Sequence, residues 1–141
     1  MKDPFDLERF VTAQQADFET IQAELRQGCK RGHWMWFVFP QLKGLGRSAT
    51  AQYYGLSSRQ EAEAYGEHPV LGPRLVDCTE LVCRVEGRSL QEIFGTVDAM
   101  KFRSSMTLFA EVQHGFSAFG KALDKYCDGQ KDSLTLSLLA Q

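Results

Sequence analysis

Apolar side chains recur at intervals of three and four residues along most of this chain, and this spacing limits the folds open to it. Two segments show it most clearly, residues 6–28 and residues 68–87. The apolar positions of the second segment include Leu71, Leu75, Cys78, Val82 and Val85. Because an α-helix makes one turn in about 3.6 residues, each segment would place its apolar side chains on one face. The spacing therefore predicts amphipathic helices.

Helix-capping patterns mark the ends of several of these predicted helices. Ser58 with Glu61 forms one capping-box pattern, Ser89 with Glu92 forms another, and Gly87 stands where the preceding helix would end. No segment shows the sustained alternation of apolar and polar residues that is typical of strands. We therefore predict an all-α fold, with more than half of the residues helical and no sheet of three or more strands.

Length and composition favour one compact multihelical domain that covers residues 1–141. Hydrophobic residues make up 43% of the chain and charged residues 24%, which is ordinary for a soluble globular protein of one domain. The predicted core residues are Leu71, Leu75, Val82, Phe102, Met106 and Phe109.

Charge and hydropathy argue against two classes of partner. The net charge is −2, so we expect no nucleic-acid partner. The longest apolar run, residues 34–39, is too short to cross a membrane. Residues 1–10 are acidic and lack the apolar stretch of a signal peptide. We expect a cytoplasmic protein without a membrane partner, whose oligomeric state the sequence leaves open.

The cysteines fit the same expectation. Cys29, Cys78, Cys83 and Cys127 are scattered along the chain and form no CxxC motif. Such spacing is poor for a shared metal ion, and disulfides are rare in cytosolic proteins. We expect reduced thiols, no metal site and no cofactor.

The predicted helix of residues 96–112 carries polar groups on its buried face. At about 100° per residue, Asp98, Lys101 and Ser105 fall within the apolar arc. Two interpretations stay open, because buried charges are costly unless they are paired or solvated. Asp98 and Lys101 could form a structural ion pair, or this face could line a cavity that holds a ligand. The opposite side, expected to face solvent, carries Arg103, Thr107 and Glu111.

The segment HWMWFVFPQ, residues 33–41, holds both tryptophans of the chain and is apolar on every side. We predict a short buried helix that Pro40 ends. Core packing is favoured for most of its aromatic rings, but a ring beside Arg47 would also suit a binding site. We expect one of Trp34 and Trp36 in the core. The other, with His33 and Gln41 at the ends of the segment, should border a cavity floored by Asp98, Lys101 and Ser105.

Four stretches together resemble the domain-of-unknown-function 1810 family over nearly the whole chain. They are DPFDLERFVTAQ, HWMWFVFPQLKGLGRSATAQYYGL, EAEAYGEHPVLGPRL and IFGTVDAMKFRSSMTLF. This resemblance implies a mainly helical single domain and no particular activity. The shorter motifs FVFPQ and MKF are also similar to the NADAR family, which is linked to ADP-ribose and to cleavage of N-glycosidic bonds.

These observations predict a pocket for a small anionic or nucleotide-like ligand, and the second resemblance implies hydrolysis of an N-glycosidic bond in an ADP-ribose-like substrate. Asp98 or Glu92 would be the acid–base residue. Lys101 and Arg47 would bind the anion, and Trp34 or Trp36 would stack on a ring. The alternative is a non-catalytic binding or interaction module in which the polar groups form a structural network. The remaining predicted ligand-binding residues are His33, Gln41 and Ser105.

Overall fold

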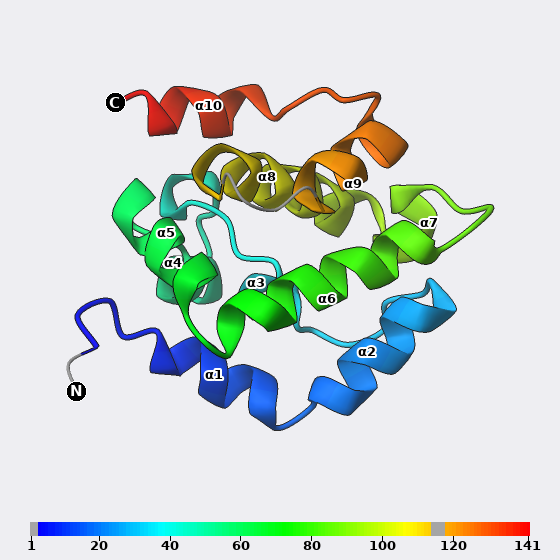
Figure 1. The fold of residues 1–141 in the computed structure, drawn as a ribbon, viewed down its shortest axis with the longest axis horizontal. Helices are drawn as coiled ribbons and strands as arrows, with labels where there is room; N and C mark the ends of the chain where they lie inside the picture. Colours follow the sequence, from blue (N-terminus) through cyan, green and yellow to red (C-terminus); the bar gives the residue numbers. More distant parts are fainter. Residues whose placement is uncertain (1–2, 114–117) are drawn as a thin grey trace.

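The computed structural model describes residues 3–113 and 118–141, and helices account for more than half of them (Figure 1). The predicted all-α class is confirmed. The described residues contain no sheet, and their one β contact is an isolated parallel bridge between Leu42 and Leu56. The helices are α1 (Glu8–Gln15), α2 (Phe18–Gln27), α3 (Met35–Val38), η1 (Lys43–Leu45), α4 (Ala49–Tyr54), α5 (Arg59–Glu67), α6 (Leu71–Arg84), α7 (Leu90–Phe94), α8 (Thr96–Val112), α9 (Ala118–Cys127) and α10 (Ser133–Leu139).

Helix α8 is the centre of the packing. It contacts α5, α7, α9 and α10, while α6 packs against α2, α5 and α9. The buried apolar side chains form one cluster that spans these helices. All of the predicted core positions are at most 1% exposed, which confirms the helix faces derived from the apolar spacing: Leu71, Leu75, Val82, Phe102, Met106 and Phe109.

The side of α8 that was predicted to face solvent is partly covered by the segment between α9 and α10, so this prediction was wrong. Thr107 is fully buried, and its hydroxyl oxygen accepts a hydrogen bond from the backbone N–H of Asp132 at 2.9 Å. The guanidinium of Arg103 donates to the carbonyls of Gln130 and Lys131. The segment after α9 therefore returns across α8 and places α10 over it (Figure 1). These contacts are polar, so apolar spacing could not reveal them.

The aromatic segment forms the predicted short helix, α3, which packs between α1 and α4. Trp34, just before α3, is 4% exposed. Its indole N–H donates to a carboxylate oxygen of Glu24 at 2.9 Å, and the same oxygen accepts from the backbone N–H groups of Arg31 and Gly32. Glu24 of α2 thus fixes the loop that leads into the aromatic segment.

Three donors to one carboxylate make the stability of this loop depend on pH. Burial alone would raise the pKa of Glu24, but the hydrogen bonds from Gly32, Arg31 and Trp34 outweigh it and hold that pKa below its ordinary value of 4.5. A carboxyl group whose pKa is lowered by folding stabilises the fold above the pKa of the unfolded state. That stability is lost as the pH falls through the pKa of the folded state.

The variant Glu24→Gln should therefore be less stable than the wild type at about pH 7, by roughly 1–3 kcal/mol, and the difference should shrink towards about pH 3. Urea unfolding across this range measures it. Glu19→Gln, an exposed position on the same helix, is the matched control and should show little loss at any pH. A Glu24→Gln deficit of constant size from neutral to acidic pH would contradict the assigned role of the carboxylate.

Candidate functional site

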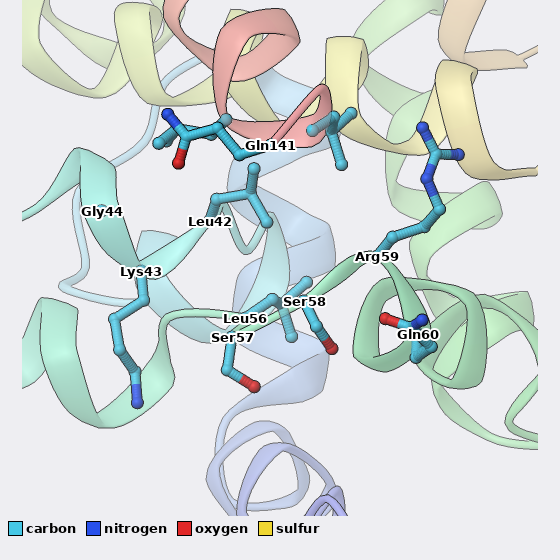
Figure 2. Close-up of a pocket in the computed structure, with 11 residues that line it drawn as sticks. Leu42, Lys43, Gly44, Leu56, Ser57, Ser58, Arg59, Gln60 and Gln141 are labelled. Atoms are coloured by element: carbon cyan, nitrogen blue, oxygen red, sulfur yellow. The ribbon is translucent and has the colours of Figure 1, made fainter.

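Two hollows of similar size lie beside α10. The first, of about 440 Å³, lies between η1, the start of α5 and the C-terminal end of α10. Its charged side chains are Lys43 and Arg59, and Figure 2 shows them extending in different directions while Leu42 and Leu56 lie between them. Because its cations do not converge, this hollow offers no focused site for a charged ligand.

The second hollow, of about 420 Å³, lies between the loop around Arg47, the first half of α8 and the start of α10, and we call it the α8 cavity. Its volume falls within the range of small-molecule sites, about 300–1,000 Å³. Its lining combines apolar, amide, hydroxyl and charged side chains. The residues are Gln41, Leu45, Gly46, Arg47, Ser48, Ala51, Val97, Met100, Lys101, Arg103, Ser104, Asp132 and Leu134.

Three cationic side chains line the α8 cavity. Arg47 comes from the loop between η1 and α4, and Lys101 and Arg103 come from α8. The structure therefore brings together three residues predicted from the sequence, namely Gln41, Arg47 and Lys101. Arg103 was missed, because the sequence assigned it to a solvent face. The Arg103 side chain lies at the cavity because its guanidinium donates a hydrogen bond to the carbonyl of Gln130, in the segment between α9 and α10.

The two tryptophans have different environments, as the sequence suggested. Trp34 is in the core, whereas Trp36 is half-buried. The ammonium of Lys101 lies 4.8 Å from the centroid of the Trp36 ring, a cation–π contact. Trp36 and Lys101 also line a narrow hollow of about 10 Å³, which shares Gln41 and Ala51 with the α8 cavity. Lys101 therefore covers one face of Trp36, which with Trp34 was one of the two candidates for stacking on a ligand ring.

Asp98 lies between two lysines. One of its carboxylate oxygens is 2.9 Å from the ammonium of Lys30, and the other is 3.6 Å from that of Lys101. The Lys30 ammonium also lies 5.2 Å from the centroid of the Trp34 ring. Asp98 is therefore part of an ion-pair network, and it is not among the described residues that line the α8 cavity. Lys30 was missed, and its position shortly before the aromatic segment was the one available signal.

Three other predicted residues lie outside this site. Glu92 is exposed, and its carboxylate accepts a hydrogen bond from the backbone N–H of Ser89 at 2.8 Å in the capping box of α7. His33 is exposed and lines neither hollow within the described chain. Ser105 is fully buried, and its hydroxyl has no hydrogen-bond partner among the described residues. The expectation that Ser105 floors the cavity is corrected, because α8 turns this hydroxyl into the core.

The described residues offer neither a reactive thiol among the cysteines with a shifted pKa nor a cluster of metal ligands. All four cysteines are unpaired. Burial raises the pKa of Cys78 to about 12 and also raises those of Cys83 and Cys127, which disfavours the reactive thiolate. Across residues 3–113 and 118–141, no group of three or more His, Cys, Asp or Glu side chains could hold a metal ion. No helix in the same part of the chain has the length and apolar character needed to cross a membrane.

Comparisons with known proteins place the chain in a family. The crystal structure of the conserved hypothetical protein Rv1873 from Mycobacterium tuberculosis is similar, with a TM-score of 0.97 and 55% sequence identity, and the match covers 99% of both chains. A search of curated proteins found no match. Residues 4–139 match the family described as "Protein of unknown function (DUF1810)". Because this match spans nearly the whole chain, the protein belongs to the DUF1810 family, as the sequence resemblance indicated.

Proposed function

We propose that the protein binds a small anionic or nucleotide-like ligand in the α8 cavity. The observation that carries this proposal is the shared cavity of Arg47, Lys101 and Arg103, whose cationic groups come from two parts of the fold. Guanidinium groups bind phosphate and carboxylate groups through paired hydrogen bonds, and an ammonium adds a compact positive charge. Gln41 adds an amide that can orient a polar ligand.

The charge balance of the cavity supports an anion. Among the described lining residues, Asp132 is the one carboxylate. One of its oxygens accepts hydrogen bonds from the hydroxyl and the backbone N–H of Thr135, so it caps α10, and the same oxygen lies 3.1 Å from the Ser104 hydroxyl. Arg47 is exposed and has no ion-pair or hydrogen-bond partner within the described residues. Its guanidinium is thus available to a ligand.

Hydrolysis of an N-glycosidic bond is the second candidate function. It is supported by the position of Asp98, whose carboxylate is 20% exposed and 3.6 Å from the ammonium of Lys101, a cavity residue. In this reaction water adds to the anomeric carbon of the sugar while the bond to the base breaks. Asp98 would accept the proton that the attacking water loses and then release it to solvent, while nicotinamide would leave NAD⁺ as a neutral base with the electron pair of the broken bond. The alternative is that Asp98 only positions Lys30 and Lys101, which leaves a non-catalytic binding module.

The variant Arg47→Gln should weaken binding of ADP-ribose about tenfold or more, because a hydrogen bond to a charged group contributes about 1.5–3 kcal/mol. Isothermal titration calorimetry measures this change. Arg26→Gln is the matched control, because Arg26 is exposed on α2, on the opposite side of the molecule from α10 (Figure 1). Equal affinities of wild type and Arg47→Gln, or no binding of ADP-ribose and inorganic phosphate to the wild type, would contradict the proposal.

The variant Asp98→Asn distinguishes hydrolysis of an N-glycosidic bond from a non-catalytic binding module. If Asp98 takes part in hydrolysis, the wild type should release nicotinamide from NAD⁺, and the variant should lose about 10²–10⁴-fold of that rate while still binding ADP-ribose. Chromatography of the reaction mixture measures the released base. No release by the wild type at high protein concentration would rule out this reaction on NAD⁺ and favour the binding module.

A further inference from the structure

Exposed apolar side chains gather at the α8 cavity. The large apolar residues that are exposed in the described chain are Tyr53, Val97, Met100 and Leu134. Three of them line this one cavity, with exposed fractions of 66%, 67% and 64% for Val97, Met100 and Leu134. We call these three residues the apolar rim. Single exposed apolar residues are ordinary on protein surfaces, but a group of them around a hollow marks a binding site.

The two sides of the apolar rim are held together by polar contacts. Met100 belongs to α8 and Leu134 to α10. The hydroxyl of Ser104 donates to the carbonyl of Met100 and lies 3.1 Å from a carboxylate oxygen of Asp132, which caps α10. The hydroxyl oxygen of Thr107 also accepts from the backbone N–H of Asp132. The rim is therefore a preformed surface, and a ligand could cover it without first ordering α10.

Apolar and cationic groups share this cavity, which restricts the chemistry of the ligand. The ring face of Trp36 is covered by Lys101, and the hollow beside it, of about 10 Å³, has room for no more than a water molecule. Trp36 is also not among the described residues that line the α8 cavity, so we expect no stacking of the ligand on it. The apolar rim lines the α8 cavity together with Lys101, and its three side chains are the large apolar residues of the lining that are exposed.

We infer that the ligand is a small amphipathic anion, namely a phosphate ester with an aryl or short alkyl group. The phosphate contacts Arg47 and Lys101, and the apolar group covers Val97, Met100 and Leu134. This inference rests on the proposed function and adds the class of ligand to it. A nucleotide fits the class where its base supplies the flat apolar part.

Calorimetry with inorganic phosphate and phenyl phosphate tests the ligand class on the full chain. The wild type should bind phenyl phosphate about tenfold more tightly than inorganic phosphate, since burying a phenyl-sized group favours binding by that order. The double variant Val97→Thr and Met100→Gln keeps the side-chain shapes and should reduce this preference to near one. Its affinity for inorganic phosphate should stay unchanged. Tyr53→Gln removes an exposed apolar residue outside the cavity and should keep the wild-type preference.

The outcomes separate this inference from the proposed function. Equal wild-type affinities for the two probes would overturn the ligand class and leave the anion site standing. No binding of either probe would overturn both. Two further measurements test other occupants of the rim. In both, the wild type shows no preference for phenyl phosphate. Binding of the wild type, but not of the double variant, to vesicles of anionic phospholipid would show that the rim serves a membrane. Dimers of the wild type, but not of the double variant, would show that the rim binds a second copy of this chain, and either result would overturn the inference.

Discussion

The carboxylate of Asp98 joins the two parts of the fold on which the candidate site depends. It pairs with Lys30, in the loop after α2, and with Lys101 on α8. Each lysine also lies against a tryptophan, Lys30 against Trp34 and Lys101 against Trp36. One carboxylate thus ties the aromatic segment to the central helix and sets the position of the Lys101 ammonium. Because Asp98 keeps 20% exposure, this network avoids the full desolvation cost of a buried ion pair.

The α8 cavity owes its shape to the return of the chain over α8. The segment after α9 binds Arg103 through backbone carbonyls, and Asp132 then begins α10 beside Ser104. Without this segment, the first half of α8 would present an open surface, because Asp132 and Leu134 would not lie beside it. The returning segment converts that surface into a hollow, because it adds the carboxylate of Asp132 and the apolar side chain of Leu134 and holds Arg103 beside them. It thereby forms the wall that a small ligand needs.

Sequence periodicity predicted the features that a helix determines by itself. The apolar arc of α8 gave the core positions Phe102, Met106 and Phe109 correctly, because their burial follows from one buried face. It failed for Thr107, which polar contacts with a distant segment bury. Gln41, Arg47 and Lys101 were predicted to share a site and do line one cavity. The ion-pair partner Lys30 and the rim residue Leu134 were not predicted, since tertiary contacts bring Lys30 to Asp98 and Leu134 to the cavity.

A crystal structure of the protein with phenyl phosphate tests the central claim most directly, which is that the α8 cavity is an anion site with an apolar edge. The account predicts density for the phosphate group within hydrogen-bond distance of Arg47 and Lys101, with the phenyl ring against Met100 and Leu134. Density for the phosphate beside Arg59 in the other hollow, with the α8 cavity empty, would contradict it.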